Sequence, residues 1–150
     1  MGGTGRIVVG LDGPGAAYDA LRWAMEEAII RDCAVEVVTV LANPDLDHDS
    51  VERMQDRLIE AASEKVPDPP SVARRCVVGA VATGLVDSSH GAALLVIGRR
   101  QVPVIHDTAT GSVVEYCSRA CECAVVVVPH AIDEAPAREH YRWRSYAGEL

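Results

Sequence analysis

The sequence predicts an open, five-stranded parallel α/β sheet with helices on both faces. Short runs of apolar residues alternate with longer amphipathic stretches along the 150-residue chain. Most of these runs are uninterrupted, which is typical of parallel strands covered on both faces. Aromatic residues make up only 4% of the chain and Phe is absent. The core must therefore be built from small and branched aliphatic side chains, which suit helices packed closely on a sheet.

The first half of the chain contains three predicted strands and two predicted helices. The strands are Arg6–Gly10, Val35–Leu41 and Val72–Val78. A helix over 16–31 is predicted because apolar residues recur at helical spacing, at Leu21, Ala24, Met25, Ala28 and Ile29. Asp49 or Ser50 is predicted to cap a second helix that runs to about Val66 and is ended by the prolines at 67, 69 and 70. Its expected buried face holds Val51, Met54, Leu58 and Ala61.

The second half continues the alternation to the end of a fifth strand. A short helix over 79–89 precedes a strand over 93–97, and a helix from Ser112 to about Ala120 precedes a strand over 124–128. We expect one α/β domain over residues 1–130. Residues 131–150 form an appended segment with three of the six aromatic residues, Tyr141, Trp143 and Tyr146. This segment is either a charged, frayed end or a helix that packs on the sheet edge or on a dimer partner.

Composition excludes several classes of function. A net charge of −8 argues against broad electrostatic binding to nucleic acid or to an anionic membrane. No apolar run approaches the roughly 18 residues that a membrane span needs, and residues 1–6 do not resemble a secretory signal. Five cysteines are an odd number, which favours the reducing cytoplasm over a disulfide framework.

Ligands of open α/β sheets bind beyond the carboxyl ends of the strands, where the strand order reverses. Three segments end there, namely residues 10–13, 41–43 and the loop that begins at Gly98. The N–H groups of Gly111, Ser112 and Val113 open the predicted fourth helix and favour an anion. Arg99 and Arg100 add positive charge. The alternative interpretation of Gly111-Ser112 is an ordinary helix cap, and Asp12 is equally suited to a turn or a cap.

Several segments together resemble the universal stress protein family over about residues 5–129. They are Ile7-Val8-Val9-Gly10-Leu11-Asp12-Gly13, Ala20-Leu21-Arg22-Trp23-Ala24, Leu94-Leu95-Val96-Ile97-Gly98, Gly111-Ser112-Val113 and Cys123-Ala124-Val125-Val126-Val127-Val128-Pro129. The resemblance implies a Rossmann-like sheet of order 3-2-1-4-5, of the adenine nucleotide α-hydrolase-like type. It also implies a stress-response function and a homodimer that pairs through the last strand.

The resemblance implies ATP binding, with Mg²⁺ accompanying the ATP. The family motif Gly-x2-Gly-x9-Gly-Ser/Thr is matched by Gly98, Gly111 and Ser112, but Gln101 replaces its second glycine. A glutamine at a position that needs φ > 0 costs about 1–2 kcal/mol. By the same correspondence, Asp12 and Ala42 would hold the ribose and adenine. The implied nucleotide-binding set is Gly10, Asp12, Ala42, Ile97, Gly98, Arg100, Gln101, Gly111, Ser112 and Val113.

Two function classes follow from the altered loop. One is an ATP-binding regulatory module of the stress response. The other is a dimeric interaction protein that binds no nucleotide, its pocket closed by residues 101–105, where Pro103 also removes a backbone donor. We identify no catalytic nucleophile or base, so an enzyme is a third possibility limited to slow ATP hydrolysis.

Cys117, Cys121 and Cys123 form the remaining cluster of chemistry-bearing residues. Cys117 and Cys121 share a helical face at i, i+4. Three interpretations stand: buried small hydrophobes, a redox-sensitive group, or a zinc site completed by His130. The prediction for the site as a whole includes no metal ligand.

Overall fold

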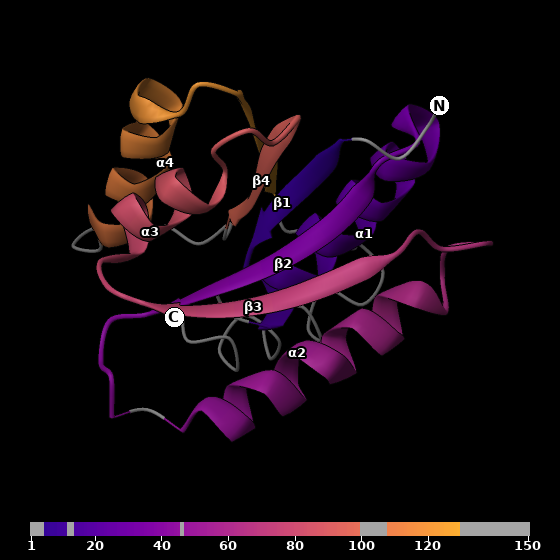
Figure 1. Ribbon diagram of the computed structural model, residues 1–150, viewed down its shortest axis with the longest axis horizontal. Coiled ribbons are helices and arrows are strands. Elements are labelled where there is room, and N and C mark those ends of the chain that lie inside the picture. Colours follow the sequence, from indigo (N-terminus) through magenta and orange to yellow (C-terminus); the bar gives the residue numbers. More distant parts are fainter. Residues whose placement is uncertain (1–4, 12–13, 46, 100–107, 130–150) are drawn as a thin grey trace, which may run out of the picture.

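The computed structural model describes residues 5–11, 14–45, 47–99 and 108–129 (Figure 1). Within them, five parallel strands form one sheet of order β3-β2-β1-β4-β5. The strands are β1 (Arg6–Gly10), β2 (Ala34–Leu41), β3 (Val72–Val78), β4 (Leu94–Arg99) and β5 (Ala124–Pro129). The predicted fold class and strand order are confirmed.

Four helices cover the sheet in pairs. They are α1 (Pro14–Arg31), α2 (His48–Ser63), α3 (Val81–Ser88) and α4 (Thr108–Ala120). Figure 1 shows α1 and α2 on one face of the sheet and α3 and α4 on the other. Every connection joins parallel strands through a helix, as this topology requires.

Two groups of buried aliphatic side chains hold these layers together. The first core lies between the sheet and helices α1 and α2, and its largest members include Ile7, Leu21, Met25 and Val96. The second core lies under α3 and α4 and contains Val8, Val38, Leu85, Leu95, Ile97 and Cys117. The alternation of strand residues between these two groups is the period-2 pattern of a sheet buried on both faces.

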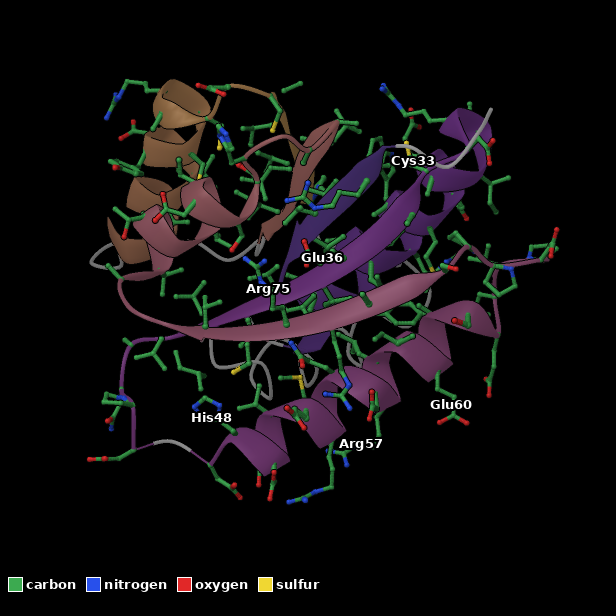
Figure 2. All side chains as sticks on the ribbon, in the orientation of Figure 1. Cys33, Glu36, His48, Arg57, Glu60 and Arg75 are labelled. Carbon is green, nitrogen blue, oxygen red and sulfur yellow. The ribbon has the colours of Figure 1, made fainter. Side chains whose placement is uncertain are left out.

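Ion pairs cover one corner of the sheet beside the end of α3. Glu36 on β2 accepts from Arg6 Nε at 3.0 Å and lies 3.7 Å from Arg75 Nη1 on β3. Figure 2 shows Glu36 and Arg75 on the same face of the two strands. The Arg6 guanidinium also donates to the carbonyl of Ser88 at 2.7 Å, which ties the end of α3 to the sheet.

The structure corrects several predicted boundaries and faces. Helix α1 begins two residues earlier than predicted, at Pro14, and α4 begins at Thr108 rather than at Ser112. Helix α2 is capped by Asp47, whose side chain accepts from the N–H of Asp49, instead of by Asp49 or Ser50. Of the apolar residues whose spacing predicted α1, Leu21, Ala24, Met25 and Ala28 are buried, whereas Ile29 is 46% exposed.

No described helix is long and apolar enough to cross a membrane. All five cysteines lie in the described residues and are free. The appended segment 131–150 lies outside the described residues.

Candidate functional site

The candidate site is the carboxyl edge of the sheet between β1 and β4. From β1 the chain proceeds to β2 on one side, whereas β4 lies on the other side of β1. The loops that follow β1 and β4 therefore diverge, which is the arrangement that opens a ligand crevice in α/β sheets. At this point Gly10 and Ile97 are direct partners in the parallel ladder. The N–H of Leu11 continues the edge by donating to the carbonyl of Val38 at 3.0 Å.

Gly98 lets the first turn of α1 reach the end of β4. A Cβ placed on Gly98 would lie 2.3 Å from the carbonyl oxygen of Ala16 and 2.7 Å from its carbonyl carbon. Backbone therefore occupies the space that a side chain would need. The close approach also brings the amino end of an 18-residue helix, with its partial positive charge, to the candidate site.

Gly10 faces the opposite side of the sheet. A Cβ on Gly10 would lie 2.9 Å from Leu85 Cδ2, so a side chain there would press on α3. Both glycines at the site thus have packing reasons to be glycine, independent of any ligand.

Ala42 lies at the same edge, directly after β2, and is exposed. The N–H of Gly79 donates to the carbonyl of Leu41 at 2.9 Å, which fixes the loop after β3 beside the end of β2. That loop is flanked by two exposed apolar side chains, Val78 (50% exposed) and Val81 (37% exposed). Nothing in the sequence marks these two valines as site residues, because a valine in a strand or helix of this pattern is expected to be buried.

The segment after Ala42 is shaped by acidic and amide side chains. Asn43 Oδ1 accepts from the N–H of Asp45 at 2.9 Å, which forms a local turn. Asp47 then accepts from the Ser50 hydroxyl at 2.7 Å and from the N–H of Asp49 at 3.1 Å. The hydrogen bond from Ser50 is the main reason why the pKa of Asp47 is lowered.

The earlier start of α4 changes the geometry expected for the loop that begins at Gly98, which the family motif implies would bind the phosphates. Gly111 and Ser112 were predicted to open the helix with free N–H groups, but they are its fourth and fifth residues. The N–H groups without an intrahelical acceptor therefore belong to the residues around Thr108. Val113 lies further in and packs partly buried against the second core, which also contains Ile97.

The structure thus brings together part of the predicted set. Gly10, Ile97 and Gly98 lie at neighbouring strand ends, Ala42 lies along the same edge, and Val113 joins Ile97 in the second core. Asp12, Arg100 and Gln101 lie outside the described residues, as do Pro103 and the rest of the predicted 101–105 plug. Within the described residues, no group of three or more His, Cys, Asp or Glu side chains could hold a metal ion.

Comparison with known proteins identifies the family to which this architecture belongs. The model of the universal stress protein family matches residues 3–129. The chain belongs to the universal stress protein family. The match covers the whole described sheet and the candidate site, and it ends at Pro129, the last residue of β5.

Solved structures of family members share the fold. A universal stress protein described as a complex with cAMP is 24% identical, with a TM-score of 0.64 over 85% of this chain and 98% of that one. The universal stress protein of Archaeoglobus fulgidus, in complex with dAMP, is 21% identical, with a TM-score of 0.66 over 83% of this chain and 97% of that one. A family protein from Burkholderia pseudomallei is 26% identical, with a TM-score of 0.57 over 83% and 95% of the two chains. No curated protein matches the chain.

Proposed function

We propose that this chain is a nucleotide-responsive regulatory module of the stress response that binds ATP, accompanied by Mg²⁺, at the carboxyl edge between β1 and β4. The observation that carries the proposal is the position of Gly98. It lies at the carboxyl edge where the strand order reverses, and its missing side chain lets the amino end of α1 approach closely. An anion placed there meets helix N–H groups and a favourable dipole. Two universal stress proteins of the same fold are described as complexes with the adenine nucleotides cAMP and dAMP.

The end of β2 is suited to the base of the nucleotide. Ala42 has a small exposed side chain, and exposed Val78 and Val81 flank the neighbouring loop. A flat, weakly polar ring gains from contact with such aliphatic groups, while backbone N–H and carbonyl groups beyond the strand end supply hydrogen bonds. We therefore place the adenine beside Ala42 and the phosphates toward Gly98 and the start of α4.

The remaining ligand contacts follow the family correspondence. Asp12 would bind the ribose, and Arg100, Gln101, Gly111 and Ser112 would surround the phosphates. Mg²⁺ would be held mainly by the phosphates themselves, because the described residues provide no cluster of metal ligands. ATP then acts as a bound signal, with hydrolysis at most slow.

Titration with nucleotides tests the proposal. Calorimetry and thermal unfolding of the full chain with ATP and Mg²⁺, AMP and cAMP should show saturable binding. A nucleotide at 100 times its Kd stabilises the folded state by about 2.7 kcal/mol, which for a domain of this size raises Tm by about 5–10 °C. No response to any of the three at millimolar concentration contradicts the proposal and favours the interaction protein whose pocket residues 101–105 close.

A matched pair of variants locates the site. Ala42→Trp places a large ring where we place the adenine and should abolish binding. Ala73→Trp is the control, because Ala73 is also exposed but lies near the amino end of β3. Equal loss of binding in both variants, or in neither, contradicts this placement.

We also propose that the chain is a cytoplasmic homodimer that pairs through β5. This strand is an edge of the sheet, and its four consecutive valines are half-buried in the single chain. An apolar edge strand with unpaired backbone groups favours pairing with another strand. The five free thiols support the cytoplasmic location.

A further inference from the structure

Three of the five cysteines, Cys117, Cys121 and Cys123, lie in the last turn of α4 and in the segment that joins it to β5, at the opposite end of α4 from its first turn. Ser89, the residue that caps the end of α3, contacts two of them and is 2% exposed. Its hydroxyl is 3.3 Å from Cys121 Sγ, and its carbonyl accepts from Cys123 Sγ at 4.0 Å. The Cys121 thiol also interacts with the thiols of both Cys117 and Cys123. Cys121 is therefore at the centre of a cluster of three sulfur atoms.

The three thiols differ in burial. Cys117 is fully buried in the second core and donates to the carbonyl of Ala82 at 3.9 Å. Burial, with smaller contributions from Cys121, raises the pKa of Cys117 to about 12, so this sulfur stays a thiol at neutral pH. Cys121 and Cys123 are both half-buried. Burial also raises the pKa of Cys123. The Cys121 sulfur lies 3.3 Å from the Ser89 hydroxyl, a group that can donate to a thiolate, so we assign the first oxidation step to Cys121.

A cavity of about 340 Å³ adjoins the cluster. Its lining residues are Val86, Asp87, Ser89, His90, Ala120 and Glu122, which include Ser89 and the chain neighbours of Cys121 but neither Cys121 nor Cys123. The carboxylates of Asp87 and Glu122 place negative charge beside the cluster, which is unfavourable for an anionic oxidant such as glutathione disulfide. A small neutral oxidant, hydrogen peroxide or an organic hydroperoxide, approaches without that cost.

We propose that Cys121 and Cys123 are a peroxide-oxidised pair that forms a reversible disulfide at the junction of α4 and β5. The Cys121 thiolate attacks one peroxide oxygen, the O–O bond breaks, and Cys121 becomes a sulfenic acid while hydroxide leaves and takes up a proton to form water. The Cys123 sulfur then attacks the sulfenic sulfur, the S–O bond breaks, and a second water leaves. Two thiols and one peroxide give one disulfide and two waters, and two electrons pass from sulfur to oxygen.

Chain geometry favours Cys123 over Cys117 as the second sulfur. Two residues separated by one other can place their Cα atoms at most about 7 Å apart, which is close to the upper limit of a disulfide. Both side chains already point to Ser89. Cys117 is the less accessible partner, because its side chain is 0% exposed in the second core.

Peptide mapping of the full chain tests this proposal. The reduced protein is treated with hydrogen peroxide, unfolded in urea, alkylated with iodoacetamide and digested with trypsin without reduction. Cleavage after Arg119 separates Cys117 from the peptide 120–138, which contains both Cys121 and Cys123. We expect this peptide unalkylated and lighter by two hydrogens than its dithiol form. Free thiols should fall from the five cysteines of the chain to three, and dithiothreitol should restore all of them.

Single-residue variants distinguish Cys121, which peroxide oxidises first, from Cys123, which then forms the disulfide. Cys123→Ser should leave Cys121 as a sulfenic acid that dimedone labels, and Cys121→Ser should prevent both the disulfide and the label. Cys76→Ser is the matched control, because Cys76 is also half-buried but lies on β3, away from the cluster; it should form the disulfide as the unmodified chain does. Where a variant does not fold, the map of the unmodified chain decides.

Three outcomes overturn the proposal. The first is a peptide 120–138 that carries two alkyl groups after treatment, which shows that both thiols stayed reduced. The second is oxidation of Cys33 or Cys76 at a lower peroxide concentration than Cys121. The third is a disulfide that joins Cys117 to the peptide 120–138.

Discussion

Gly98 on β4 lies directly under the carbonyl group of Ala16 on α1, so closely that a Cβ on Gly98 would lie 2.3 Å from the Ala16 oxygen. This contact fixes where the first helix begins relative to the fourth strand. It also means that Gly98, which the family motif assigns to nucleotide binding, has a packing role of its own. Substitutions at Gly98 must therefore be judged by stability as well as by ligand affinity.

Gly98→Ala should destabilise the fold before any ligand is considered. The added methyl group meets backbone atoms, which move only with the whole helix. We expect a loss of about 3 kcal/mol, near the upper end of the range for overpacking. Urea unfolding without nucleotide measures it.

Gly10→Ala is the matched comparison, because its new methyl group meets only the Leu85 side chain, at 2.9 Å. A side chain can change rotamer, so we expect a smaller loss, about 1 kcal/mol. Equal losses at the two positions would contradict the distinction between backbone and side-chain contacts.

The fold could be predicted because several strands and helices give the same alternating pattern. The exact ends of the helices could not be predicted, because each depends on one or two residues. All five strands were placed to within about two residues, since most of them are apolar runs and each is bounded by turn residues. The N-cap of α2 was wrong because Asp47, Asp49 and Ser50 are all good capping residues, and residue type alone does not select one of them. The start of α4 was wrong because Gly111 suggested a boundary that the helix passes through.

The candidate site was only partly predictable for a physical reason. Residues at strand ends follow from topology, so Gly10, Ala42 and Gly98 lie at the expected edge. What a loop does between strand and helix depends on contacts that periodicity does not encode. Gln55 shows the same limit in the core: a polar residue occupies the centre of a helix face for which only Val51, Met54, Leu58 and Ala61 were predicted.

Gln55→Glu should reveal how the buried polar contact works. Gln55 is 0% exposed, and its amide donates to Thr39 Oγ1 at 2.9 Å and to the carbonyl of Arg75 at 3.0 Å. A carboxylate cannot donate to that carbonyl, so we expect a loss of about 2–4 kcal/mol at neutral pH. Burial raises the pKa of such a glutamate above its unfolded value.

The pH dependence of this variant has a definite sign. The folded state keeps its proton to higher pH than the unfolded state, so the deficit relative to the unmodified chain is smallest below pH about 4.3 and grows as pH rises. Urea midpoints from pH 4 to 7 measure it. Gln55→Met is the control and should show a deficit that does not change with pH. A constant deficit in both variants would contradict a buried carboxylate.

Asp47 should make the amino end of α2 sensitive to acid. Its pKa is lowered, first by the hydrogen bond from Ser50 and then by those from the backbone. A lowered pKa means that the stabilisation is fully present above the unfolded value of 3.8 and is lost as pH falls through the folded value. Asp47→Ala should lower the urea midpoint at pH 7, and the difference from the unmodified chain should shrink below pH 4.

Asp47→Asn separates the cap from the charge. Asparagine keeps an oxygen that can accept from the N–H of Asp49, so this variant should retain much of the midpoint at pH 7 while losing the dependence on acid. An Asn variant as destabilised as the Ala variant would show that the charge, and not the hydrogen bond, stabilises this helix end.

Val127→Lys should separate the two chains of the proposed dimer without opening either core. On β5, Val125 packs against the second core, and Val126 and Val128 pack against the first, whereas Val127 belongs to neither group of described residues. A lysine at an edge strand opposes pairing with another strand. Light scattering should find twice the 16.0 kDa chain mass for the unmodified protein and a single mass for the variant. Ala73→Lys, on the opposite edge strand β3, should remain a dimer. If both variants stay dimeric, the chains pair through another surface, and if the unmodified chain is a monomer, the proposed pairing is wrong.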